Sequence, residues 1–230
     1  MDQEIDVSDC LRAPDSVCDP DPRSRSLVRL DKRTGDVYSR VLADQHRAID
    51  FFRLNETVPS RVAIHFETAK NLYLYAWFVF RFYPVSEQQA LASLEFALRE
   101  RFPGFVKEQH SRKRRLGLKK LLNHAIENEY VKNEMFSIRE RWAWQRAETR
   151  HSYGKIQEMM VAGLESMERN ESEVTVTQED LNCDWLGIFK ENIPKIRNQY
   201  AHGSGELKHT VLHTFELVSE IINQLYLKAK

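Results

Sequence analysis

The sequence predicts an all-α protein, a bundle of helices that follows a polar N-terminal segment. After residue 37, apolar residues recur at spacings of three and four along most of the chain, as on one face of a helix. Short polar breaks that contain Pro or Gly separate these stretches. Residues 1–36 have no such period and are rich in Asp, Ser and Arg. We therefore expect a loosely structured tail over 1–36 and a single helical domain over 37–230.

Four helices are expected between residues 37 and 131. The second of them is apolar on all sides in its C-terminal half, which indicates a central position in the bundle. Pro84 is expected to break this helix, and Ser86 with Gln89 matches a capping box at the start of the next one. The helices cover 37–54, the stretch after Pro59 with Val62, Phe66, Ala69, Tyr73, Ala76 and Phe80 on one face, the stretch from Ser86 to about Pro103, and 117–131.

Three further helices are expected in the second half of the chain. The first covers about 138–167 and is followed by a polar loop over 170–177. The second is expected to kink or restart at Pro194 and to end before Gly203, because Gly commonly follows the last turn of a helix. The apolar stripes of the last two helices are Leu186, Phe189, Ile193, Ile196 and Tyr200, and then Val211, Phe215, Val218, Ile222 and Leu225.

The composition is that of a globular protein with a balanced charge. Hydrophobic residues make up 42% of the chain and charged residues 30%, which is sufficient for a buried core. Lys plus Arg equals 34 and Asp plus Glu equals 34, so the whole chain has no net attraction for nucleic acid. Any contact with RNA would have to come from a local group of basic side chains.

Neither a membrane segment nor a disulfide framework is expected. The longest apolar run, 72–83, has 12 residues and includes Arg81, whereas a membrane-spanning helix needs ~20. The acidic start, MDQEIDVSDC, lacks the apolar core of a secretion signal. Three cysteines, Cys10, Cys18 and Cys183, match no metal-binding or disulfide spacing. We therefore expect a cytoplasmic protein.

One segment carries a pattern with chemical meaning, Ile196-Arg-Asn-Gln-Tyr-Ala-His-Gly203. It places Arg197, Asn198 and His202 near the end of one helix, before a loop and a final helix. This layout resembles the signature of HEPN domains, in which Arg, a polar residue such as Asn, three further residues and His occur in that order. The resemblance is specific over 184–228. Over 37–170 it rests on helical content alone, and it does not include the tail.

The resemblance implies a HEPN-like helical bundle with additional helices. It also implies a metal-independent endoribonuclease activity that needs no cofactor. Arg197, Asn198 and His202 would be its catalytic residues, in a composite site at a homodimer interface. The expected products are a 2′,3′-cyclic phosphate and a 5′-hydroxyl. HEPN proteins commonly act in toxin–antitoxin, phage-defence or stress-response systems, so an antitoxin or another defence-system protein is an expected partner.

Helix geometry is consistent with a site shared between two chains. Asn198 and His202 are four residues apart and share a helix face, whereas Arg197 and His202 are separated by about 140° at ~100° per residue. The Arg and His of one chain would therefore not converge on one phosphate, but two chains related by a two-fold axis could supply them from both sides. Imidazole transfers protons near neutral pH, and a guanidinium stabilises charge on phosphoryl oxygens.

Two other interpretations of the motif remain open. Arg197 could simply flank the core while His202 caps a helix C-terminus. Alternatively, a HEPN bundle could bind RNA or a partner protein, or mediate dimerisation, without cleaving RNA. Pairing with a nucleotidyltransferase-like antitoxin is less expected, because HEPN toxins of that type often carry Tyr two residues after the motif His, where this chain has Ser204.

Two groups of ionisable residues outside the motif allow a plain and a functional interpretation. His209 and His213 are four apart and could bind a metal, although a solvated pair is the favoured interpretation. Glu95 lies on a largely apolar helix and is expected either at the boundary of the core or in the cleft.

The basic run and the aromatic residues also allow two interpretations each. The run 112–120 could contact RNA phosphates but is more often only solvated. The aromatic cluster 73–83 is expected in the core rather than as a platform for stacking bases. Trp142 and Trp144 are assigned no function.

Overall fold

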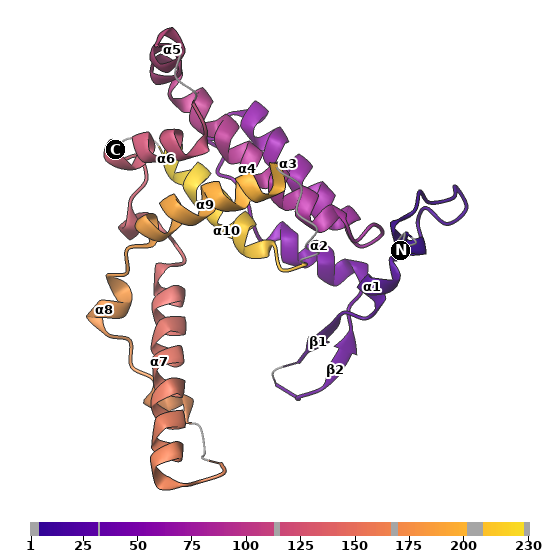
Figure 1. The fold of residues 1–230 in the computed structure, drawn as a ribbon, viewed down its shortest axis with the longest axis vertical. Helices are drawn as coiled ribbons and strands as arrows, with labels where there is room; N and C mark the ends of the chain where they lie inside the picture. The colour runs from indigo at the N-terminus through magenta and orange to yellow at the C-terminus, as the bar shows by residue number, and fades with distance from the viewer. Residues whose placement is uncertain (1–4, 32, 113–115, 167–169, 202–208, 228–230) are drawn as a thin grey trace.

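The computed structural model describes residues 5–31, 33–112, 116–166, 170–201 and 209–227. Across these residues the predicted all-α fold is confirmed, because a short two-stranded hairpin is the one departure from helical and irregular structure (Figure 1). In chain order the elements are η1 (Val7–Asp9), α1 (Pro22–Arg25), β1 (Val28–Leu30), β2 (Val37–Ser39), α2 (Leu42–Asp50), α3 (Ser60–Tyr75), α4 (Phe82–Arg101), α5 (Pro103–Ser111), α6 (Leu118–Glu127), η2 (Asn133–Met135), α7 (Arg139–Ala162), η3 (Glu171–Glu173), α8 (Gln178–Leu181), α9 (Trp185–Ala201) and α10 (Leu212–Leu225).

The core lies where α3, α4 and α10 pack together. Helices α3 and α4 run along each other, α10 packs on α4, and α9 packs on α6 and α4 (Figure 1). The five apolar positions predicted for the last helix are at most 1% exposed, and the six predicted for the second helix are at most 7% exposed. Hydrophobic burial along these stripes therefore determines which face of each helix points inward.

The aromatic cluster belongs mainly to this core, as predicted. Tyr73 and Tyr83 are at most 1% exposed and contact each other edge to face, with ring centroids 5.3 Å apart. Gln45 satisfies polar groups in this region, because its Nε2 donates to the Tyr73 carbonyl oxygen at 2.8 Å and to the Tyr83 hydroxyl at 2.9 Å. Burial raises the pKa of Tyr83 to about 12, so its hydroxyl stays protonated. Tyr75, in contrast, is 54% exposed.

The predicted helix over 37–54 is wrong at both ends. Residues 37–39 form β2, which pairs antiparallel with β1, and the helix α2 spans only Leu42–Asp50. The turn chemistry explains the difference. Asp31 accepts hydrogen bonds from the backbone of Arg33 and Thr34, and Gly35 adopts a positive φ of 77°. These are the features of a tight turn that joins two strands.

Part of the N-terminal segment is held firmly against the bundle. Asp21 and Ser24 are fully buried, and the Asp21 carboxylate accepts a hydrogen bond from the backbone N–H of Phe80 at 3.2 Å. Burial acts to raise the pKa of Asp21, but hydrogen bonds from Arg23 and from Phe80 hold it below its ordinary value. Arg81 and Arg23 also pair with Asp9 and lower the pKa of Asp9 to about 2. The described part of this segment is thus anchored by charge and hydrogen bonds.

Proline and glycine set several helix ends differently from the prediction. Pro84 lies in the first turn of α4, where its missing N–H costs no helical hydrogen bond, so it does not end the preceding helix. Ser86 is buried and donates to the Tyr83 carbonyl oxygen instead of capping. Helix α5 was not predicted and begins at Pro103. Helix α7 ends before Gly163, whose φ of 65° terminates it earlier than residue 167.

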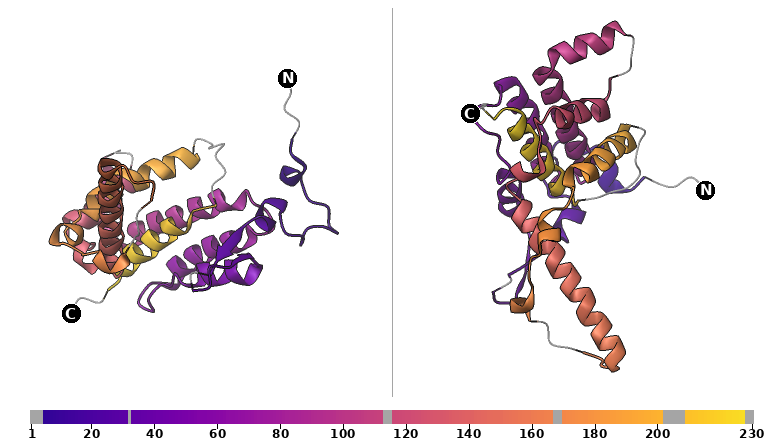
Figure 2. Two further views of the ribbon diagram at one scale, coloured as in Figure 1. Left: turned by 90° about the horizontal axis from the view of Figure 1, so that it is seen from below. Right: turned by 90° about the vertical axis from the view of Figure 1, so that its left-hand side faces the viewer.

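Helix α7 projects from the bundle, with α8 beside it, and the right-hand view of Figure 2 also shows this projection. In its first turns Trp142 and Ala143 are buried against the bundle, whereas Tyr153, Ile156 and Met160, farther along, are at least half exposed. Helix α9 is continuous through Pro194. Among the helices of the described residues, none combines the length and the apolar character needed to cross a membrane.

Replacing Phe215 with Ala is expected to lower the free energy of unfolding by ~3–5 kcal/mol, because the ring is fully buried and its loss leaves a cavity beside Phe66 and Tyr73. Phe51→Ala is the matched control. Phe51 is 71% exposed, so its removal should change the unfolding free energy by less than ~0.5 kcal/mol. Urea denaturation of both variants measures the difference, and equal losses would contradict the placement of α10 in the core.

Candidate functional site

Helix α9 presents the motif residues through the burial of its opposite face. Leu186, Phe189 and Ile193 are at most 7% exposed and fix the rotation of α9 against the bundle. This leaves Arg197 half-buried and Asn198 exposed. The described part of α9 ends at Ala201, so His202, Gly203 and Gly205 lie outside the described residues.

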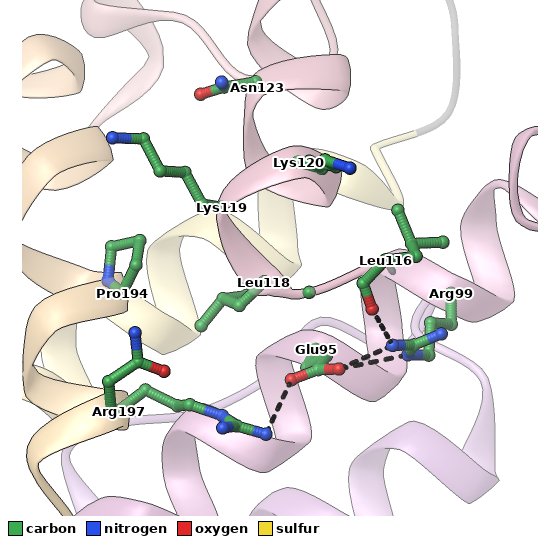
Figure 3. A pocket seen from close by; sticks show the side chains of 11 residues that line it. Glu95, Arg99, Leu116, Leu118, Lys119, Lys120, Asn123, Pro194 and Arg197 are labelled. Carbon is green, nitrogen blue, oxygen red and sulfur yellow. Dashed lines mark hydrogen bonds and ion pairs between the residues drawn. The ribbon is translucent and has the colours of Figure 1, made fainter. Parts of the chain in front are cut away.

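Arg197 and Asn198 line a cavity of about 750 Å³ between α4, α6 and α9 (Figure 3). Its walls carry four cationic side chains and a single carboxylate. Such an excess of cations attracts an anion, and guanidinium groups bind phosphate oxygens with a planar fork of donors. The polar and charged residues of this wall are Glu95, Arg99, Lys119, Lys120, Asn123, Arg197 and Asn198.

Glu95 connects two of the arginines across the cavity. Its Oε1 accepts hydrogen bonds from Arg99 Nη2 at 2.7 Å and Nε at 3.2 Å, and its Oε2 lies 3.7 Å from Arg197 Nη2. Arg99 is held further by donating to the Leu116 carbonyl oxygen at 2.7 Å. Figure 3 shows the Glu95 carboxylate between the two guanidinium groups. Glu95 is thus half-buried at the boundary of the core, as expected, and it also lines this cavity.

The wall formed by α6 contributes the end of the basic run. Lys119 pairs with Glu191 at 3.1 Å, and both side chains are more than half exposed. Asn123 Oδ1 is buried and has no hydrogen-bond partner within the described chain. At the start of the run, Arg112 pairs with Glu108, and residues 113–115 lie outside the described residues. The run thus contributes Lys119 and Lys120 to the cavity, a placement that helix α6 determines.

The two histidines considered as a metal pair are not on one helix. Helix α10 begins at Leu212, so His209 precedes it and the four-residue spacing does not place both rings on a common helical face. His213 lies 3.6 Å from Glu216, and His209 lies near Phe80 and Tyr83. No group of three or more His, Cys, Asp or Glu side chains suited to a metal occurs in the part of the chain that the structure describes.

Comparison of the chain with protein-family models, with curated proteins and with solved structures returns no match. The similarity to HEPN domains therefore rests on the motif and on its place before the final helix. What this similarity implies for activity, partners and oligomeric state is a matter for proposal and experiment.

Glu95→Gln is expected to strengthen the binding of a phosphate-bearing probe about threefold to tenfold, because it removes the carboxylate that competes for Arg197 and Arg99. The probe is a single-stranded 2′-O-methyl oligonucleotide, measured by fluorescence anisotropy. Glu108→Gln is the control, because Glu108 is exposed and pairs with Arg112 away from the cavity. Weaker binding by Glu95→Gln would mean that the carboxylate is needed to hold the arginines in place.

Proposed function

We propose that the chain is a metal-independent endoribonuclease of HEPN type. The observation that carries this proposal is the position of Arg197 and Asn198 at the end of α9, in the wall of a cavity with three further cations. The order of helix, motif and final helix supports the same conclusion, because α10 follows the motif segment. An RNA phosphate is the ligand that best suits this cationic site, and the motif supplies a candidate proton-transfer residue, His202, five positions after Arg197 in the sequence.

The proposed reaction uses the nucleophile that RNA itself provides. The ribose 2′-oxygen attacks the adjacent phosphorus while the bond from phosphorus to the 5′-oxygen breaks. One imidazole accepts the 2′-hydroxyl proton, and a protonated imidazole gives a proton to the departing 5′-oxygen. Arg197 stabilises the charge that develops on the phosphoryl oxygens. The products are a 2′,3′-cyclic phosphate and a 5′-hydroxyl, and no metal or cofactor takes part.

A homodimer belongs to this proposal. Acid and base steps need two proton-transfer groups, and residues five apart in sequence, as Arg197 and His202 are, would be separated by about 140° on one helix. A second chain supplies the other Arg and His across a two-fold axis. A toxin or defence setting, with an antitoxin-like partner, is proposed from the resemblance to HEPN proteins alone.

A second candidate function is a non-catalytic HEPN bundle that binds RNA or a partner protein. The ion pair between Glu95 and Arg197 favours this alternative, because a carboxylate lies where a phosphate would compete for the guanidinium. Catalysis would require the phosphate to displace Glu95 from Arg197. RNA binding through Lys119 and Lys120 would leave the ion pair between Glu95 and Arg197 in place.

His202→Ala is expected to lower the rate of RNA cleavage by roughly 10²–10⁴-fold, because it removes a positioned proton-transfer group. Arg197→Ala should lose a comparable factor, and Arg197→Lys should rescue poorly, because an ammonium lacks the forked donors of a guanidinium. The assay contains EDTA and includes a DNA substrate, which should remain intact because it lacks the 2′-hydroxyl.

His110→Ala is the matched control, since His110 is exposed on α5, and thermal melting checks that each variant is folded. Wild-type cleavage by His202→Ala would refute a catalytic site at this position. Cleavage that stops in EDTA and returns with Mg²⁺ would refute the metal-independent mechanism.

Sedimentation velocity is expected to show a dimer at micromolar concentration, because the composite site needs two chains. The cleavage rate per protomer should fall on dilution below the dissociation constant of the dimer. A monomer that cleaves RNA at a rate independent of concentration would contradict the shared site.

A further inference from the structure

A second cavity, of about 450 Å³, lies where α7, α8 and the start of α9 meet. It shares no lining residue with the cavity beside Arg197. Among the described residues, its walls combine three aromatic side chains with two arginines and two carboxylates, and the proposed cleavage chemistry uses none of them. The residues that matter are Trp142, Arg146, Arg150, Tyr153, Asp180 and Trp185.

The aromatic wall has a rigid base and an exposed edge. Trp142 is 3% exposed and packs on Trp185, with ring centroids 4.5 Å apart. Phe136 and Phe189 hold Trp142 from its other sides, at 5.8 Å and 5.6 Å between ring centroids. Tyr153 lies on the same face of α7 as Trp142, about three turns farther along the helix, and is 66% exposed. A flat ligand can therefore contact the half-buried Trp185, which the buried Trp142 holds in place, at one end of the cavity and Tyr153 at the other.

Two N–H groups at this cavity have no acceptor in the described chain, Arg146 Nε and Trp185 Nε1. Both groups can only donate, and leaving a buried donor unpaired costs about 1–3 kcal/mol. Both atoms are covered by neighbouring atoms, so an acceptor reaches them only if a covering side chain moves. Arg146 can make this movement, because its side chain is 40% exposed.

The buried carboxylate of this wall, Asp180, already has its hydrogen-bond donors. The Asp180 side chain is 2% exposed, and it accepts hydrogen bonds from Arg150 and from the backbone and hydroxyl of Thr177. The bond from Arg150 and those from Thr177 hold the pKa of Asp180 well below its usual range, so it stays charged. Arg146 Nε lies 4.0 Å from this carboxylate, which attracts its charge without accepting a hydrogen bond. The second carboxylate of the wall, Glu179, is exposed to solvent, so the buried groups left unsatisfied are donors, and a complementary ligand presents acceptors to them.

We infer that this cavity binds one nucleobase of an unpaired RNA strand. A base has a flat face that stacks on aromatic and guanidinium groups, and its edge carries carbonyl and ring-nitrogen acceptors. The volume falls in the range of small-molecule sites. The inference rests on the proposed function for the identity of the ligand as RNA, and it specifies a single-stranded substrate.

The position of the cavity makes it a contact for a flanking nucleotide. Trp185 begins α9 and Arg197 lies twelve residues later, so the two sites are ~18 Å apart along the helix at 1.5 Å per residue. A base bound here therefore belongs to a nucleotide away from the bond that is cleaved. It contributes to affinity and sequence preference, and it leaves the chemistry at Arg197 unchanged.

The test measures binding of a single-stranded 2′-O-methyl oligonucleotide, which cannot be cleaved because its 2′-oxygen is blocked. Tyr153→Ala is expected to raise the dissociation constant about fivefold or more, since it removes a stacking partner. Tyr75→Ala is the matched control, because Tyr75 is 54% exposed on α3. Arg146→Lys keeps the charge but removes the guanidinium Nε, so it should also weaken binding of the oligonucleotide. Arg47→Lys is its control and should leave binding unchanged, because the Arg47 side chain is 75% exposed.

A second arm uses the same oligonucleotide backbone without bases, together with a poly-glutamate competitor. The abasic strand should bind more weakly than the complete strand and should be insensitive to Tyr153→Ala. Competition by poly-glutamate that Tyr153→Ala abolishes would mean that the cavity takes an acidic peptide, and this result would overturn the inference. The inference would also be overturned if Tyr153→Ala and Arg146→Lys both bound the oligonucleotide as the wild type does, or if the wild type did not bind it.

The two proposals fail separately. If the wild type cleaves RNA but Tyr153→Ala and Arg146→Lys bind the uncleavable strand normally, the nucleobase cavity is refuted and the ribonuclease stands. If the wild type binds the strand through Tyr153 and Arg146 but cleaves nothing, the nucleobase cavity is supported and the ribonuclease is refuted.

Discussion

The burial of α10 is the constraint on which the rest of the fold depends. Its apolar stripe fills the space beside α4, and its polar side chains bond to segments far away in the chain. Asn223 accepts from the backbone of Asn55 and donates to the Arg53 carbonyl oxygen, while Gln224 accepts from the backbone of Lys132. These contacts join the N-terminal half to the segment before α7. Further contacts are the pairs Thr214–Glu87, Glu216–Arg141 and Glu220–Ser137.

Because α4 and α10 provide a fixed base, α9 lies at one rotation and presents different chemistry at its two ends. Its first residue, Trp185, closes an aromatic cavity, and Arg197 in its last turns closes a cationic one. The chain has no net charge, yet the described wall of the cavity beside Arg197 carries four cations and one carboxylate, whereas two arginines and two carboxylates balance in the aromatic cavity. Binding to a phosphate strand would therefore depend on local charge, and it should weaken with salt, since counterions screen exposed lysines.

The helical fold could be predicted because periodic burial is a local pattern. Each apolar stripe is visible within a dozen residues, and the bundle buries it wherever the helix packs. The β-hairpin was missed although its signal is also local, in Asp31 and Gly35 at a turn between two three-residue strands that each begin with Val. The role of Pro84 was misjudged because a proline that interrupts a helix and one that begins it look alike in sequence.

The sequence alone determined that Arg197 and Asn198 lie beside each other near the end of a helix, because helix geometry depends only on neighbouring residues. Tertiary structure decided what surrounds them. Glu95 and Lys119 reach the cavity from α4 and α6, about 100 and 80 residues before Arg197, and no local period relates these positions. The aromatic cavity likewise needs α7 to pack on α8 and α9. Long-range packing places such side chains together, since it is the shared core that selects which helix faces meet.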